Sequence, residues 1–582
     1  MSRTAYPRPE FRRESWQNLN GDWEFEFDPG CTAKARGILN KDRLDAEIRV
    51  PFCPESKLSG LNHLDFIRGC VYARNVTLTR KENERHLLHF EAAYHRTEVY
   101  VNGLPAGIHT GGYTPFTFDI TPMSVQGENR IVVLCTGDPR DPSQPSGKQS
   151  EQYHSHGCLY TRSTGIYGTV WTETVPEVYL RSVRLTPRTG DKAGVLAELF
   201  LEGAGTRTVS LSASFGGVPV SSETLCTSAP YLTVFLPVPE PRLWDVGQPN
   251  LYDLDIDVLS DAGTDSVRTY FGLRSVEWDS VSLKINGRRV YQRLVLDQGY
   301  FPDGIYTAPD DGDFAADITR AMRFGFNGAR LHQRVFDRIY LYEADRMGFL
   351  VWGEYANWGF DYSAPDALTH YLPEWAEAVD RDYNHPSLIG WCPFNETWDH
   401  GGLYRDRHDD LLARIYLYTK RVDPTRPCIH TSGNFHVLTD FYDIHDYCQD
   451  VATFEKRYLS LKEGEIYENF GHRQSYGGQP YWVSEYGGIR WIPEFQRSDD
   501  DKLWGYGEAP KTEEEYLTRF EGLTAALARS GRVCGVCYTQ LYDVELERNG
   551  LYCYDRTPKF SEAVMDRMAR AMAAPAAIEQ EP

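Results

Sequence analysis

The sequence predicts a multidomain chain in which two all-β sandwiches precede a C-terminal (β/α)8 TIM barrel. Short runs of alternating apolar and polar residues, broken by turn residues, fill the first half of the chain. Near residue 280 the rhythm changes, and apolar runs begin to alternate with helical stretches. Eight such runs follow within the C-terminal part of the chain, which is the strand number of a TIM barrel.

Residues 1–176 are expected to form the first sandwich. Their alternating runs are separated by turn signals such as Asn102-Gly103. The loop 138–149 is rich in Pro and Ser and is too long for a hairpin turn. It either reaches a site in another domain or is a plain surface loop. The clearest strand-like runs are Trp23–Phe27, His86–Phe90, Thr97–Val101 and Arg130–Leu134.

Residues 177–277 are expected to form a second, smaller sandwich. Its runs include Tyr179–Leu185 and Val209–Phe215, in which apolar residues alternate with serines or charged residues, and it ends near Tyr270–Arg274. About a hundred residues of short strands fit an immunoglobulin-like sandwich.

Residues 278–582 are expected to form the barrel. The apolar runs lie at 290–296, 328–331, 349–353, 387–392, 427–430, 441–445, 481–484 and 533–538. The predicted helices are Asp313–Phe324, Asp337–Met347, Leu403–Arg421, Thr512–Ala528 and Lys559–Met572. After the last helix, Ala574–Ala577 is expected to be a frayed tail.

Composition excludes several classes of protein. The chain has 582 residues and a formal net charge of -22, without the basic stripe of a nucleic-acid-binding protein. The N-terminus has no apolar stretch of signal-peptide length, and no window approaches a membrane span, so we expect a cytoplasmic protein with no membrane partner. Cys534 and Cys537 form a CxxC within a strand-like run, where they point to opposite faces, so we predict no metal site there.

Two carboxylic acids stand where predicted strands end. Glu396 follows Asn395 and the apolar run 387–392, and Glu485 ends the run that begins at Tyr481. Cleavage of a glycosidic bond needs one carboxylic acid that donates a proton and one carboxylate below the anomeric carbon. An Asn-Glu pair alone is also a common loop cap, so the surrounding sequence pattern has to distinguish a catalytic acid from a cap.

The ends of the other predicted strands also carry polar side chains. In a TIM barrel the site is built from the loops that follow the strands. Strands four and seven face one another across the barrel mouth, so Glu396 and Glu485 are expected to meet there. The strand-end residues, in chain order, are Asp297, His332, Glu354, Asn395, Glu396, Tyr447 and Glu485.

Several motifs throughout the chain make it resemble glycoside hydrolase family 2. That resemblance implies a jelly-roll sugar-binding domain, an immunoglobulin-like sandwich and a catalytic TIM barrel. The motifs are Leu19–Trp23, Glu98–Gly103, Gly165–Trp171, Leu283–Gly287, Phe326–His332, Pro393–Thr397, Ser484–Gly487 and Tyr538–Glu545.

The resemblance implies a role for each central residue. Glu396 is expected to be the general acid and base, and Glu485 the nucleophile of a double displacement that retains the anomeric configuration. Asn395 resembles the residue that binds the sugar 2-hydroxyl. The two carboxyl groups are then expected about 5 Å apart.

Further residues are expected to bind the substrate. Tyr447 resembles the tyrosine that holds the nucleophile ionised, although it can equally be an aromatic residue that packs at the barrel rim. Arg330 and His332 fall in the second-strand Arg-and-His region. Glu354 and Asp297 either accept hydrogen bonds from sugar hydroxyls or pair with a barrel Arg. Trp482, next to the nucleophile strand's end, is expected to stack on a sugar face.

The family resemblance leaves the sugar open. β-Galactosidase is the default, and β-glucuronidase, β-mannosidase and arabinosidase are alternatives. The stretch Glu547–Leu551 lacks the Lys of the glucuronidases' Asn-x-Lys motif, although a Lys or Arg from another loop can replace it. A catalytically inactive carbohydrate-binding protein is the alternative from another class.

No cofactor is needed for the core reaction. Metal dependence is left open, because the ligand set of the family's metal-dependent members has no match that we can identify here. The expected partner is a glycoside or oligosaccharide, and a dimer is the expected oligomer.

Overall fold

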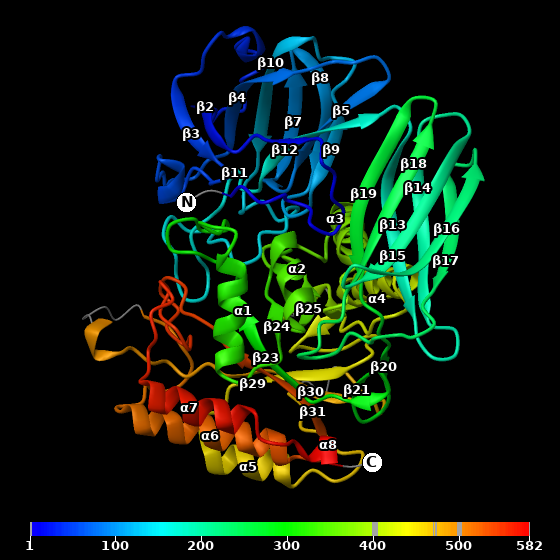
Figure 1. Ribbon diagram of the computed structural model, residues 1–582. Coiled ribbons are helices and arrows are strands. Elements are labelled where there is room, and N and C mark those ends of the chain that lie inside the picture. Colours follow the sequence, from blue (N-terminus) through cyan, green and yellow to red (C-terminus); the bar gives the residue numbers. More distant parts are fainter. Residues whose placement is uncertain (1–2, 398–404, 470, 472–473, 497–502, 581–582) are drawn as a thin grey trace.

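The computed structural model describes residues 3–397, 405–469, 471, 474–496 and 503–580. Figure 1 shows two β-sandwiches, one in blue and one in cyan and green, beside a mixed α/β body that runs from green to red. The predicted fold class is therefore confirmed, while the exact boundaries at 176 and 277 stay predictions. Among the described helices, none is long and apolar enough to cross a membrane.

The first sandwich packs a four-stranded sheet against a six-stranded one. Alternation places Trp23, Phe25, Leu88 and Val133 in one buried core between the two sheets. The four-stranded sheet has the order β1 (Trp16–Asn18), β12 (Val170–Pro176), β5 (Glu84–Phe90) and β9 (Phe116–Asp119). The six-stranded sheet has the order β3 (Ala46–Val50), β2 (Gly21–Phe27), β4 (Gly69–Leu78), β10 (Gly127–Thr136), β7 (Arg96–Val101) and β8 (Leu104–Thr110), and β6 (Ala93–Tyr94) pairs with β11 (Gly165–Ile166).

The second sandwich has its own core. Val195, Leu211, Ile256 and Val267 are buried between its two sheets. One sheet has the order β13 (Tyr179–Arg188), β14 (Gly194–Glu202) and β17 (Tyr231–Pro237), and the other has β16 (Val218–Thr227), β15 (Arg207–Phe215), β18 (Tyr252–Ser260) and β19 (Gly263–Phe271). A small sheet of β20 (Val276–Trp278), β21 (Leu283–Ile285) and β22 (Arg288–Arg289) leads into the barrel.

Seven of the eight predicted barrel runs are strands of one parallel sheet. Their order places the fourth and sixth strands at the two edges, as in a barrel that closes through its fifth position. From edge to edge the strands are β26 (Leu388–Cys392), β25 (Leu350–Glu354), β24 (Gly328–Leu331), β23 (Gln292–Asp297), β31 (Val533–Thr539), β30 (Tyr481–Gly487) and β29 (Tyr442–Asp446).

The fifth run, 427–430, was wrongly predicted to be a continuous strand. Pro427 has no N–H to donate, and the N–H of Cys428 donates to the Asp440 carboxylate at 2.8 Å. Trp391 still exchanges backbone hydrogen bonds with Pro427 and Ile429 at 3.0 and 2.9 Å. The short strands β27 (Phe394–Asn395) and β28 (Thr431–Ser432) then pair in parallel. The gap between β26 and β29 is therefore bridged by short pairings.

The helices surround the barrel strands, with α5, α6 and α7 side by side below the sheet in Figure 1. Three of them, α3, α5 and α8, were not predicted, and the start of the helix predicted from Leu403 lies outside the described residues. The helices are α1 (Asp313–Arg323), α2 (Arg338–Met347), α3 (Ala367–Asp382), α4 (Arg405–Val422), α5 (Val451–Leu459), α6 (Glu513–Arg529), α7 (Glu562–Met572) and α8 (Ala577–Gln580).

The segment after α7 is not frayed as predicted. Ile578 is 1% exposed, and the Glu579 carboxylate lies 2.8 Å from Arg293 Nη2. Arg293 Nη2 also donates to the Ala574 carbonyl at 2.8 Å. This ion pair and the buried Ile fix the segment against the base of the barrel.

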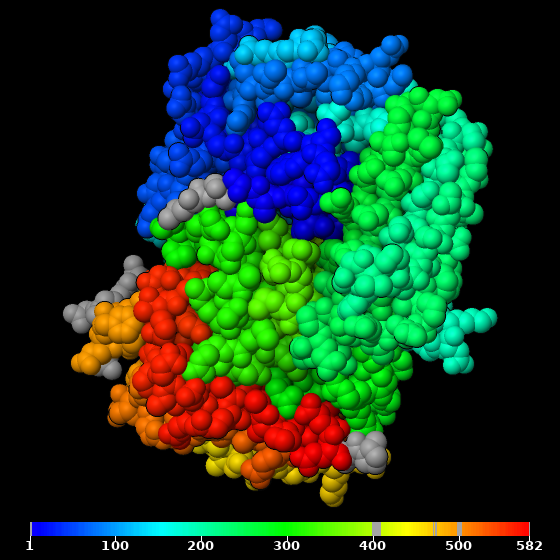
Figure 2. Space-filling model, viewed as in Figure 1, coloured from blue at the N-terminus to red at the C-terminus, as the bar shows by residue number. Residues whose placement is uncertain are grey.

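The N-terminal segment connects the three parts of the chain. Figure 2 shows it in dark blue, between the green barrel surface and the second sandwich. Arg3 pairs with Asp311 at 2.6 Å, on the barrel side, while the buried Arg13 pairs with Asp265 of the second sandwich at 2.7 Å. These contacts hold the first sandwich in one position over the barrel.

Candidate active site

Glu396 and Glu485 meet at the carboxyl ends of barrel strands, as predicted. Glu396 follows β27, and Glu485 lies within β30. One carboxylate oxygen of each lies within 4.8 Å of the other. Glu396 has a φ of 47°, a left-handed conformation that is uncommon for a residue with a side chain. Its N–H donates to the Ser432 carbonyl at 2.9 Å, which fixes this backbone turn.

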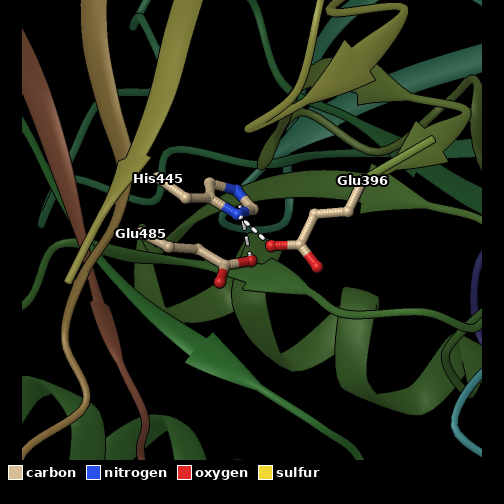
Figure 3. Close-up of side chains that lie close together, drawn as sticks. All are labelled: Glu396, His445 and Glu485. Atoms are coloured by element: carbon tan, nitrogen blue, oxygen red, sulfur yellow. Dashed lines mark hydrogen bonds and ion pairs between the residues drawn. The ribbon is translucent and has the colours of Figure 1, made fainter. Parts of the chain in front are cut away.

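A histidine that the sequence interpretation did not select lies between the two acids. Figure 3 shows the imidazole of His445 directed at both carboxylates. Its Nδ1 lies 2.7 Å from Glu396 Oε1, and its Nε2 lies 3.4 Å from Glu485 Oε1. Gly433, with a φ of 74°, lies so close to the ring that an added Cβ would come within 2.2 Å of it. A side chain at position 433 would therefore displace His445.

The hydrogen bonds of His445 indicate where the protons on its two ring nitrogens lie. The Ser432 hydroxyl donates to Asp443 at 2.7 Å and lies 3.1 Å from His445 Nε2. The assignment that fits these contacts has Ser432 donating to the Asp443 carboxylate and accepting from His445 Nε2. The 2.7 Å contact between Nδ1 and Glu396 then holds one further proton, either on the imidazole or on the carboxyl group.

The charged groups around His445 and Glu396 favour a proton held between them. Burial lowers the pKa of His445, but the Glu485 and Glu396 carboxylates raise it above its usual value overall. Although burial opposes it, His445 lowers the pKa of Glu396. His436, His445 and Ser484 likewise lower the pKa of Asp443 to about 2, against the effect of burial. Asp443 is thus an ionised acceptor at neutral pH.

Arg330 connects the residues of the site and is fully buried. Its Nε donates to Glu354 at 2.6 Å. Its Nη1 donates to Glu485 Oε1 at 3.1 Å and to the Ser484 carbonyl at 2.8 Å, and its Nη2 donates to Asn395 Oδ1 at 3.1 Å. A planar guanidinium with several donors suits this position, where one cation orients two carboxylates and an amide.

Asn395 has a free donor in this site. Its Oδ1 is occupied by Arg330, while its buried Nδ2 has no hydrogen-bond partner among the described residues. The backbone carbonyl accepts hydrogen bonds from Asn357 Nδ2 at 2.9 Å and Trp358 Nε1 at 3.1 Å. A buried, unpaired N–H group is costly, so a ligand hydroxyl that accepts from Nδ2 would be stabilised.

Tyr447 contacts the second acid directly. Its hydroxyl donates to Glu485 Oε2 and lies 3.1 Å from Thr539 Oγ1. Its ring stacks on Tyr506, with an angle of 5° between the planes. Of the two alternatives for this residue, a hydrogen bond to Glu485 and packing at the rim, the structure shows both.

His332 and Glu354 form a pair beside Arg330. The two oxygens of Glu354 accept hydrogen bonds from Arg330 Nε at 2.6 Å and from His332 Nδ1 at 3.0 Å, and Gln333 N–H lies 3.3 Å away. Burial, followed by the positive charge of Lys148, lowers the pKa of His332 well below its usual value. Of the two alternatives expected for Glu354, the structure shows the carboxylate that pairs with a barrel Arg.

Asp297 does not join the acid pair. Its Oδ1 accepts hydrogen bonds from Gly299 N–H at 2.9 Å and from the Tyr542 hydroxyl. Along β23, Gln292 Oε1 accepts a hydrogen bond from an interior Trp at 2.7 Å, whereas Arg293 reaches the outer Ala574. Because strand side chains alternate, Asp297 shares the outward face of Arg293. Burial raises its pKa to about 6, and its hydrogen bonds within the described part of the chain do not include either acid.

Trp482 also differs from its predicted role. Its side chain is 1% exposed and packs on Trp352, with ring centroids 5.0 Å apart. Trp352 packs in turn on Phe441. Trp482 is therefore part of the barrel interior and has no free face for a sugar.

A different tryptophan, Trp358, lines the cavity at the barrel mouth. This cavity has a volume of about 540 Å³ and is bounded by the loop 138–149, residues 357–363 and Glu396. The N–H groups of Ser146 and Gly147 donate to the Trp358 carbonyl at 2.9 and 3.0 Å. The ammonium nitrogen of Lys148 lies 3.9 Å from the centre of the Trp358 ring. The loop of the first sandwich thus reaches the site, the first of the two predicted alternatives.

A second loop of the first sandwich closes the other side. The Tyr160 hydroxyl donates to Glu547, and the Thr161 N–H lies 3.1 Å from both Glu545 oxygens. Glu545 and Glu547 follow β31, the eighth strand. The candidate active site is therefore completed by two loops from another part of the chain.

Sequence reasoning missed His445 and Lys148. A signal for His445 existed, because it lies near the end of β29, two residues before Tyr447, and residues two apart in an extended chain face the same way. Lys148 had no such signal, since only the docked loop places it at the barrel mouth.

One group of metal-ligating side chains occurs in the described part of the chain. It consists of Glu396, His445 and Glu485, the same residues that form the site.

Comparison with known protein families identifies all three parts of the chain. Residues 65–143 match "Glycosyl hydrolases family 2, sugar binding domain", residues 178–274 match "Glycosyl hydrolases family 2", and residues 334–492 match "Glycosyl hydrolases family 2, TIM barrel domain".

Relatives and solved structures agree with this assignment. A β-glucuronidase of Paenibacillus borealis is 23% identical over 89% of each chain, and a β-galactosidase of Thermoanaerobacterium thermosulfurigenes is 25% identical over 81% of this chain and 64% of that one. The chain spans about half of another relative, a Formosa agariphila protein that is 28% identical over 73% of this chain and 52% of that one. The fold is similar to that of a Bifidobacterium dentium β-glucuronidase, with a TM-score of 0.79, 19% identity and coverage of 97% and 98%. The chain therefore belongs to glycosyl hydrolases family 2, and it is a glycosidase.

Proposed function

We propose that this chain is a retaining, exo-acting β-glycosidase in which Glu485 is the nucleophile and Glu396 is the general acid and base. The observation that carries this proposal is the separation of the two carboxylates, whose nearest oxygens lie within 4.8 Å. Retaining enzymes place the two groups about 5 Å apart, whereas inverting enzymes need about 6.5 Å or more to admit a water molecule.

The two displacement steps follow from the contacts of each acid. Arg330 and Tyr447 both donate to Glu485, which stabilises the carboxylate form that attacks the anomeric carbon. The proton shared by Glu396 and His445 passes to the leaving oxygen. Glu396 then removes a proton from water, which releases the sugar from Glu485. Asn395 Nδ2 has no hydrogen-bond partner among the described residues, so it is free to donate to the 2-hydroxyl as the transition state forms.

The surrounding loops favour a terminal sugar. The docked loop 138–149 and the contact between Tyr160 and Glu547 border the barrel mouth on two sides, and a mouth narrowed in this way suits the end of a chain better than its middle. This is the basis for the exo-acting mode of the proposal.

The sugar has two leading candidates. β-Galactoside was the default from the sequence, and one relative is named a β-galactosidase. β-Glucuronide has equal standing, because other relatives and several structures of the same fold are named β-glucuronidases. The Lys148 ammonium at the barrel mouth favours the acidic sugar.

A panel of 4-nitrophenyl β-glycosides tests the proposal and identifies the sugar. We expect nitrophenol release from at least one of the glucuronide, galactoside, glucoside, mannoside and α-arabinoside. Proton NMR of the first-formed product should show the same anomeric configuration as the substrate. Binding of sugars without hydrolysis of any glycoside would instead favour an inactive carbohydrate-binding protein.

Substitution His445→Asn tests the shared proton. In the unsubstituted protein, His445 and Glu396 both bind this proton. In the variant only Glu396 binds it, so the proton should be lost at a lower pH. The high-pH limb of the kcat/KM profile is expected to move down by about one pH unit. The profile is measured with the best substrate of the panel. An unchanged high-pH limb would show that His445 holds no part of the catalytic proton.

A further inference from the structure

Lys148 is a buried cation with a free donor group. Its side chain comes from the first sandwich and is 5% exposed, although Lys is among the residues least often buried without a partner. Among the residues that the structure describes, none accepts a hydrogen bond from its Nζ or forms an ion pair with it. The Trp358 ring centre lies 3.9 Å from Nζ, and an aromatic ring holds a cation without using its N–H donors.

The backbone around Lys148 is fixed on both sides. The Lys148 carbonyl accepts a hydrogen bond from the Tyr160 N–H at 2.7 Å, and Gly147 N–H donates to the Trp358 carbonyl at 3.0 Å. Gly147 has a φ of 58°, and a Cβ there would come within 2.5 Å of the Gln333 carbonyl oxygen. Only a glycine therefore allows the loop to approach the barrel this closely, so the position of Lys148 is built into the fold.

The charged groups that act on Lys148 include both acids of the site. Burial lowers its pKa, but Cys158, Glu547, Glu396 and Glu485 raise it overall. Glu396 and Glu485 are the two acids of the site, and Lys148 in turn lowers the pKa of His332. Lys148 is thus charged at neutral pH.

A role limited to neutralising these acids does not explain the geometry. A lysine with that role would form ion pairs with them, yet no carboxylate among the described residues lies within 4 Å of its Nζ. Glu547, the carboxylate that raises the pKa of Lys148 most, instead accepts hydrogen bonds from Tyr160 and from Asn549 Nδ2. The N–H donors of Lys148 are left for a ligand.

We propose that Lys148 binds the carboxylate of a β-linked hexuronic acid, so that β-uronides are the preferred substrates. This inference rests on the proposed glycosidase function. An ammonium that lacks an acceptor in a water-poor pocket pairs favourably with a carboxylate. Lys148 also supplies a lysine, which the stretch Glu547–Leu551 lacks.

The test compares two substrates that differ only at this group. The 4-nitrophenyl β-D-glucuronide carries a carboxylate where the β-D-glucoside carries a hydroxymethyl group. In Lys148→Met, kcat/KM for the glucuronide is expected to fall about 100-fold, while that for the glucoside changes less than about 3-fold. Lys148→Arg should retain part of the glucuronide activity, because it keeps the charge. Comparison of kcat/KM for the 4-nitrophenyl β-D-galacturonide and the β-D-glucuronide shows which of the two uronic acids is preferred.

Controls separate this inference from the function on which it rests. Lys57→Met also removes one positive charge from the first sandwich, but at a side chain that is 68% exposed. It should leave kcat/KM for both substrates unchanged. Thermal unfolding checks that each variant folds, and Lys148→Gln replaces Lys148→Met if the latter does not. Faster turnover of the glucoside by the unsubstituted protein, or an equal fall for both substrates, would overturn the proposal.

If no glycoside is cleaved, the proposed function fails, and binding then decides the role of Lys148. D-Glucuronate and D-glucose are titrated into the protein and into Lys148→Met by calorimetry. Binding of the uronate that the variant loses upholds the inference. Equal binding by both proteins, or binding by neither, contradicts it.

Discussion

Glu485→Gln is expected to lower kcat by about five orders of magnitude. The amide has nearly the same shape as the carboxylate, but it cannot form the glycosyl ester. Its carbonyl oxygen can still accept a hydrogen bond from Arg330 or Tyr447, the two donors that contact Glu485 in the structure. The fold should therefore be retained, and the loss should be almost wholly in kcat. Release of nitrophenol from the best panel substrate measures it.

The control for this variant is Glu485→Asp, which keeps the charge and retracts the carboxylate by one methylene group. It is expected to be slow but measurably more active than Glu485→Gln. Thermal unfolding of both variants should match the unsubstituted protein within a few degrees. Undiminished turnover by Glu485→Gln would remove this residue from the mechanism.

Glu396→Ala is expected to have an effect that depends on the leaving group. The rate of the first step should fall by about three orders of magnitude for a poor leaving group that needs a proton. A 2,4-dinitrophenyl glycoside needs no proton, so its first step should be nearly unaffected. The second step lacks its base and becomes rate-limiting, so a rapid burst of dinitrophenol should precede slow turnover.

Azide provides the matching rescue experiment for this variant. A small anion fits the space that the carboxylate leaves and needs no general base, so added azide should speed turnover and give a β-glycosyl azide. The unsubstituted protein should show neither effect. An equal rate loss for all leaving groups, without rescue, would mean that Glu396 has a structural role only.

The sequence predicted the strand-end acids well because their positions depend on local patterns. Glu396 and Glu485 each follow a long apolar run, and such a run at this spacing is a barrel strand whose end faces the site. Other helices and strands were harder to predict, and the reasons are also local. Helix α3 contains Pro373, which reads as a helix breaker. The fifth strand is interrupted where Pro427 and the Asp440 carboxylate replace the regular pairing.

The direction of a side chain and contacts between distant segments were less predictable. Asp297 stands at a strand end but points outward, and Trp482 lies one layer below the site against Trp352. His445 was detectable from its alternation with Tyr447. Lys148 depends on a loop from the first sandwich that docks on Trp358, and no pattern around position 148 indicates that docking.

The most direct test of the central claim is to trap the covalent intermediate in Glu396→Ala. The variant is mixed with the 2,4-dinitrophenyl form of the best glycoside, quenched during the burst, digested and analysed by mass spectrometry. We expect one glycosyl residue on the peptide that contains Glu485, with the ester on that side chain. A glycosyl residue attached elsewhere, or turnover without any adduct and with inverted product, would contradict the account.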